Sequence, residues 1–336
     1  MMKKYLLTAL AAIAAILFGA CSNDNITINR KFTISVDASE VPAAFSNIEA
    51  SQAINGISTV TDGFRLRVRV LVYNSEGKAV VSLQQYRDSY FDAGTPFSTE
   101  LENGIYTFVA ITDIVPPSVS SIKSIWTLTN ESDINKAVLT YNEESNSAKY
   151  AILGIKSQQI TITEKTQNVT LLPKPAGALV RIIFTGMATA AQNGYYLFAL
   201  RTNHTPKTID FKEGKVSTHS EVSENNSQGQ MTRNGIDYAI DARQEESDGM
   251  TGSYLFFLPC EINCRFAYIM SDRSSGWCGP VLTGTLEAGV GYAAKLDLTA
   301  CGNIVSEAST ATFIQPGAGG VSQTAPIRSL RLADIK

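Results

Sequence analysis

Histidine and catalytic motifs are scarce in this 336-residue chain. Histidine occurs only as His204 and His219, both in polar sequence typical of loops. The sequence contains no HExxH, GxSxG, P-loop or dinucleotide-binding glycine fingerprint. A carboxylate pair of the glycosidase kind has no local pattern, but the acidic residues cluster in loop-like sequence such as Glu143-Glu144. We therefore predict no catalytic residues, no metal site, no cofactor and no enzymatic activity.

Charge is also sparse. Charged residues make up 18% of the chain, and 28 Lys and Arg stand against 31 Asp and Glu. Because nucleic-acid recognition depends on clustered basic residues that neutralise phosphates, this composition argues against a nucleic-acid partner. Apolar residues make up 44%, which suffices for buried cores, and the length suits two domains better than one.

The start of the chain predicts an export signal. Lys3 and Lys4 precede an uncharged run, residues 5–20, that is shorter than the roughly 20 residues of a membrane-spanning helix. The sequence Phe-Gly-Ala-Cys that ends this run at Cys21 resembles the lipobox of bacterial lipoproteins, whose cysteine is diacylated and becomes the new N-terminus. We predict a signal peptide at 1–20 and a lipidated stub at 21–30. A secretory signal with an incidental cysteine is the alternative.

Four further cysteines lie in the last quarter of the chain: Cys260, Cys264, Cys278 and Cys301. An exported location favours pairing into disulfides, whose connectivity the sequence leaves open. A zinc site built from all four cysteines is a more specific alternative, because the spacing of the first two falls within the range that zinc sites use. Free thiols buried as small apolar groups are the third interpretation.

Alternation of apolar and polar residues dominates the chain and predicts strands. Residues 64–73 read Phe-Arg-Leu-Arg-Val-Arg-Val-Leu-Val-Tyr, which places three arginines on one face and apolar residues on the other. We expect these arginines to be solvated; an anion site is the alternative. The sequence Asn74-Ser-Glu-Gly77 then predicts a tight turn and a hairpin.

Other segments complete the expected organisation. Further strands are predicted at 32–36, 105–111, 150–155, 159–163, 168–172, 178–184, 195–200, 254–258, 266–270 and 291–298. Residues 132–139 look helical, and residues 217–231 read as a long exposed loop. Because Pro173 and Pro175 cannot both lie in a central strand, we place the boundary between domains 31–172 and 176–301 there.

The tail, residues 302–336, is predicted to be an extension and not a third domain. It contains two short strand candidates, 310–314 and 327–332, joined by a glycine-rich spacer. Such a tail suits addition of an edge strand to a sheet of this chain or of a neighbour. A strand that completes its own domain is the alternative.

Aromatic residues allow two interpretations. The residues considered are Trp126, Trp277, Tyr86, Tyr90, Tyr195 and Tyr196. They could form a platform on which sugar rings stack, or fill a sandwich core. Trp277, in the loop-like sequence Ser-Ser-Gly-Trp-Cys-Gly, is the best candidate for an exposed ligand contact.

Four features occur together in this sequence. They are the leader, the hairpin that starts at Phe64, the strand Asn103-Gly-Ile-Tyr-Thr-Phe-Val-Ala, and the first strand after the proline boundary, Ala176-Gly-Ala-Leu-Val-Arg-Ile. With them, residues 30–300 resemble the fimbrillin-like and minor-fimbrial-anchor lipoproteins of Bacteroidales, the subunits of type V pili. The resemblance implies an all-β fold of two tandem transthyretin-like (Ig-like) β-sandwich domains. It also implies a lipid-anchored outer-membrane protein, at the cell surface or in a fimbrium, whose partners are other fimbrial subunits joined by strand addition.

In polymerising members of that group an arginine-specific protease releases an N-terminal strand, and a neighbour's strand fills the groove. Arg30 is the only arginine before Arg65, which makes it the candidate processing site. A cut there would release only residues 22–30 beyond Cys21, a short segment for such a strand. This favours an anchor or accessory subunit. A glycan-binding surface lipoprotein is the alternative function, with host or bacterial surface glycans or proteins as partners.

Overall fold

The computed structural model describes residues 29–46, 63–116, 124–142, 151–185, 192, 195–202, 205–219, 237–241, 251–270, 275–297, 310–314 and 322–326. Apart from the short helix α2 (Glu40–Ala43) and the 3-10 turn η3 (Lys212–Gly214), the named elements are strands. The predicted all-β, sandwich-type fold class is confirmed. No helix in these ranges is long and apolar enough to cross a membrane.

We call the part of the molecule built mainly from residues before 176 the first half, and the part built mainly from later residues the second half. The first half contains two sheets made of residues before 176. The β1 sheet has the order β4-β1-β9 and the β5 sheet the order β10-β8-β5-β2-β3. Their bounds are β1 (Arg30–Val36), β2 (Arg65–Tyr73), β3 (Ala79–Arg87), β4 (Phe97–Leu101), β5 (Gly104–Val115), β8 (Leu153–Ile162), β9 (Asn168–Leu171) and β10 (Lys174–Pro175). The predicted hairpin is present, because β2 pairs with β3 across a turn in which Gly77 has φ +77°.

A third sheet joins segments that are far apart in the sequence. The β7 sheet has the order β14-β13-β7-β6, with β6 (Trp126–Thr129), β7 (Val138–Tyr141), β13 (Thr208–Asp210) and β14 (Ser217–His219). In it β13 pairs antiparallel with β7, so that Ile209 lies opposite Leu139. The segment that carries β13 and β14 thus returns across the predicted domain boundary to the first half, an arrangement that the sequence did not suggest.

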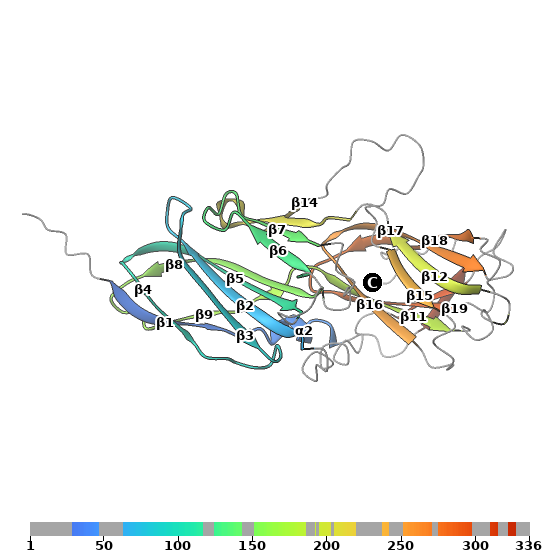
Figure 1. Cartoon of the computed structure of the whole chain (residues 1–336), viewed down its shortest axis with the longest axis horizontal. Helices are drawn as coiled ribbons and strands as arrows, with labels where there is room; N and C mark the ends of the chain where they lie inside the picture. The colour runs from blue at the N-terminus through green and yellow to red at the C-terminus, as the bar shows by residue number, and fades with distance from the viewer. Residues whose placement is uncertain are drawn as a thin grey trace, which may run out of the picture.

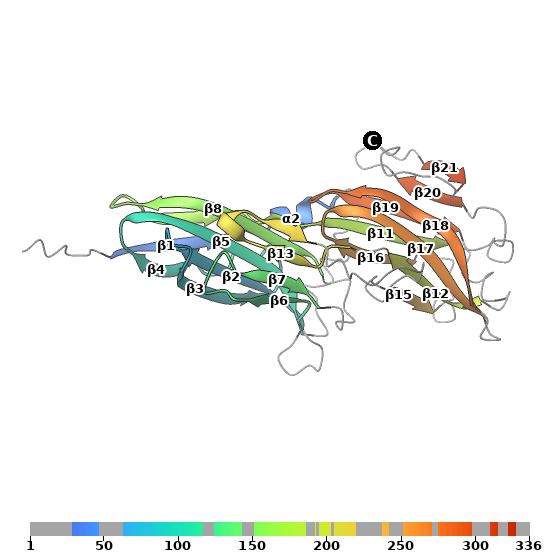
Figure 2. The ribbon, with the colours of Figure 1, turned by 90° about the horizontal axis from the view of Figure 1, so that it is seen from above.

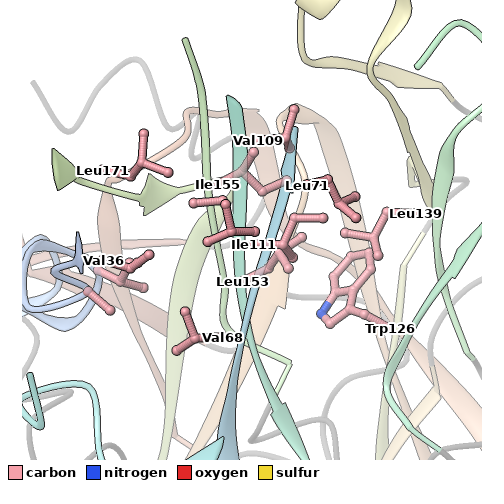
Figure 3. Close-up of a cluster of buried hydrophobic side chains, with 14 of the residues drawn as sticks. Val36, Val68, Leu71, Val109, Ile111, Trp126, Leu139, Leu153, Ile155 and Leu171 are labelled. Carbon is pink, nitrogen blue, oxygen red and sulfur yellow. The ribbon is translucent and has the colours of Figure 1, made fainter. Parts of the chain in front are cut away.

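The core of the first half lies on both faces of the β5 sheet. Successive side chains of a strand point to opposite faces, so Val68 and Leu71 on β2 belong to different layers. Figure 3 shows Val36 on one side of the central strands and Trp126 and Leu139 on the other. All of these side chains are buried. The β5 sheet is therefore covered by the β1 sheet on one face and by the β7 sheet on the other.

The second half contains two further sheets, which lie as two layers beyond the first half along the long axis (Figures 1 and 2). The β19 sheet has the order β16-β11-β19-β20-β21 and the β17 sheet the order β15-β12-β17-β18. Their bounds are β11 (Ala178–Thr185), β12 (Tyr195–Thr202), β15 (Asp237–Asp241), β16 (Thr251–Phe257), β17 (Cys260–Met270), β18 (Ser275–Leu286), β19 (Gly291–Asp297), β20 (Thr310–Ile314) and β21 (Ser322–Pro326).

Several local predictions are wrong. Residues 132–139 form turns followed by β7 instead of a helix, because the Asp133 side chain accepts the backbone N–H of Asn135 and closes a local turn. The first residues of the loop expected at 217–231 form β14, because sheet pairing with β13 overrides their polar composition. Residues 220–231 lie outside the described residues, so the rest of that loop stays a prediction. The strands expected at 150–155 and 159–163 are one continuous strand, β8.

Candidate functional site: the N-terminal strand and the sheet edges

Strand β1 follows the predicted stub and occupies the centre of its sheet. It pairs antiparallel with β4, from Arg30 opposite Leu101 onwards, and parallel with β9. The backbone N–H of Thr33 donates to the carbonyl of Gln167 at 3.0 Å, which fixes the register with β9. Both edges of β1 are therefore in use for main-chain pairing.

The side chains of β1 explain why it is held there. Phe32, Ile34 and Val36 are 2%, 0% and 2% exposed and alternate with more accessible residues. The ring of Phe32 meets the ring of Phe108 on β5 edge to face, with centroids 6.4 Å apart. Burying three such side chains favours folding by about 1.5–3 kcal/mol each. A chain without β1 would expose an apolar groove between β4 and β9.

Arg30, the predicted processing site, is the first residue of β1. Its Nη2 lies 3.2 Å from Oε1 of Glu164, and its side chain is 27% exposed. Because Arg30 is paired with β4, a protease could bind the bond after it only if this end of the strand came away from the sheet. Cleavage there would still leave 31–36 in place. The proteolytic role of Arg30 stays a prediction.

A surface cleft of about 670 Å³ lies beside Glu164, the ion-pair partner of Arg30. It is lined by Asn103, Gly104 and residues 161–165, from the start of β5, the end of β8 and the turn after β8. Its charged residues are Glu164 and Lys165. This set supplies one carboxylate, one ammonium group and threonine hydroxyls, and not the carboxylate pair that glycoside hydrolysis requires.

The tail forms a hairpin on its own chain. Strand β20 coincides with the predicted strand 310–314 and pairs antiparallel with β19, and β21 pairs with β20. The structure thus shows the alternative in which the tail completes a sheet of its own half. The candidate 327–332 lies outside the described residues. Within the described strands β21 is an edge of the β19 sheet, and its outer main-chain groups face no partner strand.

The arginine face of β2 is mostly buried, contrary to expectation. Nε and Nη2 of Arg67 donate to the two carboxylate oxygens of Asp113 at 3.0 and 2.6 Å, and Nη2 also donates to the carbonyl of Trp126 at 3.1 Å. Arg69 lies 4.0 Å from the same carboxylate. The β7 sheet covers this face, which the alternation of residues alone could not show. Only Arg65 is as solvated as predicted, with a side chain 50% exposed.

The arginines of β2 are also candidates for a site that binds an anion. The anion is the chain's own Asp113, which is 0% exposed. Burial works to lower the pKa of Arg67, but the hydrogen bond and charge of Asp113 raise it above the usual value. Burial lowers the pKa of Arg69, where the more distant carboxylate compensates less. The cluster fits a structural role that joins two strands of the β5 sheet to β6.

The aromatic candidates for a ligand contact differ in their burial. Trp126 and Tyr90 are buried, and they donate to the carbonyls of Ala151 and Ile152 at 2.9 and 3.1 Å. Tyr86 is 47% exposed. Trp277 lies within strand β18, opposite Ala267, and not in a loop. Its role as a ligand contact stays a prediction, as does that of Tyr195 and Tyr196 on β12.

The cysteines are only partly described. Cys260 is a free, half-buried thiol whose pKa burial raises to about 11. Cys264 lies opposite Leu282 on β18, while Cys278 lies opposite Phe266 on β17, so these two cysteines are on neighbouring strands without being direct partners. Cys21 and Cys301 lie outside the described residues. Disulfide pairing therefore stays a prediction.

No family model and no curated protein matches this chain. Among solved structures it is similar to a protein of Bacteroides thetaiotaomicron proposed to be an adhesin, with 10% identity, a TM-score of 0.47, and coverage of 90% of this chain and 100% of that one. It is also similar to a protein of the same species proposed to bind polysaccharide, with 10% identity, a TM-score of 0.43, and coverage of 88% and 98%.

A third similar structure is the fimbrial anchor protein Mfa2 from Porphyromonas gingivalis, with 10% identity, a TM-score of 0.40, and coverage of 89% of this chain and 100% of that one. All three similarities extend over most of both chains. At these identities and TM-scores they establish no family membership for this chain.

Proposed function

We propose that this chain is a cell-surface lipoprotein that serves in adhesion as an anchor or accessory subunit of a fimbrium of the type V pilus kind. Its N-terminal cysteine would hold it in the outer membrane, and its partners would be other subunits joined by β-strand addition. The lipobox-like sequence at Cys21 and the strand-built body support this assignment.

The observation that carries the proposal is the position of β1. A stalk subunit of this kind must lose its first strand before a neighbour can fill the groove. Here β1 begins at Arg30, and Phe32, Ile34 and Val36 are built into the core. A cut at Arg30 would remove the stub without opening the β1 sheet. This favours a chain that keeps its own strand and its lipid.

The outer edge of β21 is the best candidate surface for strand addition. Main-chain N–H and C=O groups of an edge strand offer a template for another strand. The β20–β21 hairpin belongs to the second half, while β1 starts at the end of the first half that points away from the second half (Figure 2). An anchor at residue 21 would therefore hold this edge away from the membrane.

Mass spectrometry of the native N-terminus tests the anchor. A diacylated Cys21 is the expected result. A start at Lys31 would indicate a released subunit, and an unmodified Cys21 would overturn the assignment. Cys21→Ala should move the protein from the membrane to the soluble fraction, while Cys260→Ala, which changes a cysteine of the body, should leave it in the membrane.

A truncation tests the partner surface. Removing residues 302–336 should abolish co-purification with other surface subunits and leave a folded monomer, because the β20–β21 hairpin is the outermost part of its sheet. Circular dichroism of the truncated chain supplies the folding control. Assembly that is unchanged by the truncation would rule out this surface.

Glycan binding is the second candidate function, and one observation favours it. Tyr86 is 47% exposed, its hydroxyl accepts a hydrogen bond from Nε2 of Gln84 at 2.8 Å, and the guanidinium of Arg65 lies 5.8 Å from its ring centroid. An exposed aromatic ring beside amide and guanidinium groups suits stacking on a sugar. Retention on polysaccharide affinity gels should then fall for Tyr86→Ala and for Trp277→Ala. A wild-type chain that no gel retains would remove this candidate.

A further inference from the structure

We infer that β1 is a mechanical clamp, which keeps the first half folded when the molecule is pulled between its anchored N-terminus and its second half. The inference rests on the proposed attachment at Cys21 for the direction of the pull. It goes beyond that proposal because it assigns a mechanical role to one strand pair, β1 with β9.

The direction of the strands sets the geometry of the load. β1 starts at the end of the first half that points away from the second half, and runs towards α2 near the junction of the two halves (Figures 1 and 2). β9 runs parallel to it, with Val36 opposite Leu171. The chain then leaves β9 through β10 and enters the second half at β11. Tension would therefore pull β1 and β9 in opposite directions along their common axis.

A parallel pair loaded in this way is sheared and not unzipped. When strands are unzipped, their hydrogen bonds break one after another, whereas a lengthwise pull loads all of them together. The bonds on this side of β1 include Thr33 N–H to Gln167 O and Asp37 N–H to Leu171 O, both 3.0 Å. The pairing with β4 on the other side is sheared by the same pull.

The buried side chains of β1 add a second barrier. Slipping a strand by one residue turns every side chain to the opposite face. A slip of β1 by one position would bring Lys31, Thr33 and Ser35 towards the core in place of Phe32, Ile34 and Val36. The strand must therefore move by two residues, roughly 6.6 Å, before its pattern fits again. Hydrogen bonds and apolar contacts then have to yield in a single step.

The two halves are joined firmly enough for the load to reach β1. Besides the direct connection through β10, strand β13 pairs with β7, and Oγ of Ser157 on β8 donates to the carbonyl of Gly214 at 2.6 Å. Load from the second half thus enters the first half at several strands. It leaves the first half towards the anchor through β1 alone.

Single-molecule force spectroscopy on the unlipidated chain from residue 22 to residue 336, with handles at its two ends, tests the clamp. Opening under load is governed by the unfolding rate, so a sheared β1 should give a distinct high-force event. Thr33→Pro removes the N–H that donates to Gln167, while the side chain that it replaces is exposed. This variant should lose the high-force event.

Ser82→Pro in the edge strand β3, an exposed position of another sheet, is the matched control. It should keep the high-force event even if equilibrium stability falls. A second pulling geometry covers the case in which Thr33→Pro does not fold. With the first handle moved to a tag after Glu76, in the β2–β3 turn, β1 leaves the load path and the first half of the wild-type chain should open at lower force.

Equal forces in the two geometries, or equal loss of the event in both proline variants, would overturn the clamp. These outcomes are independent of the proposed function, because the pulled protein carries no lipid. An unmodified Cys21 in the native protein would remove the anchor and leave the force measurements intact.

Discussion

The carboxylate of Asp113, on β5, lies under the β7 sheet and accepts two hydrogen bonds from the guanidinium of Arg67 on β2. The two residues are direct cross-strand partners. Arg69 shares the same carboxylate from farther away, so two buried cations depend on one buried anion. The stability of the first half should therefore be sensitive to this single acidic residue.

Asp113→Ala should destabilise the chain by about 3–5 kcal/mol, because it leaves buried guanidinium groups without a counter-charge. Chemical denaturation followed by circular dichroism measures the change. Glu164→Gln is the control, since the Glu164 side chain is 75% exposed and its pair with Arg30 should contribute at most about 1 kcal/mol. Equal losses in the two variants would contradict a buried role for Asp113.

Gly154→Ala should destabilise the contact between β8 and α2. A Cβ at this position would lie 2.4 Å from Oγ1 of Thr112 and 2.5 Å from Cγ2 of Val41, both of which are buried. Overpacking of this kind costs roughly 1–3 kcal/mol. At Gly104 the nearest atom would be 3.3 Å away, on the ring of Tyr106. Thermal unfolding should therefore show a smaller loss for Gly104→Ala, and the reverse order would refute the packing argument.

Alkaline pH should weaken the fold through Tyr141. Burial raises the pKa of its hydroxyl from 10.0 to about 12, so the folded state retains a proton that the unfolded chain releases. This contribution to stability is complete below about pH 10 and is lost as the pH rises towards 12, which amounts to about 1.4 kcal/mol at pH 11. Urea midpoints between pH 8 and about 11 measure the loss. Tyr141→Phe should show a smaller decline with pH, and an unchanged decline would assign the effect to other groups.

Trp126 should report the packing of the β7 sheet on the β5 sheet. It is 2% exposed, meets Tyr141 edge to face at 5.4 Å and donates Nε1–H to Ala151 O. In a Trp277→Phe background it is the only tryptophan, and its emission should lie at the short wavelengths of an apolar environment. Trp126→Phe should cost about 1–3 kcal/mol, because a buried carbonyl loses its donor. Emission typical of solvated indole would contradict this packing.

Much of the strand content could be predicted from alternation. The hairpin after Phe64, the strand at Ile105 and the tail strand at Thr310 all occur where the pattern places them. The errors have physical causes. The helix expected at 132–139 gives way to a turn held by Asp133, and the solvated face expected for Arg67 is covered by strands from elsewhere in the chain. A local pattern cannot report which distant segment covers a face.

The sequence by itself determined the β class and the place of strands such as β2 and β5, since both follow from the period of side chains along an extended chain. Only the tertiary structure decided that β1 lies between β4 and β9, that β13 crosses to the first half, and that Asp113 neutralises the arginines of β2. These features depend on pairing between residues far apart in the chain, where loop closure and packing, and not local propensity, select the partner.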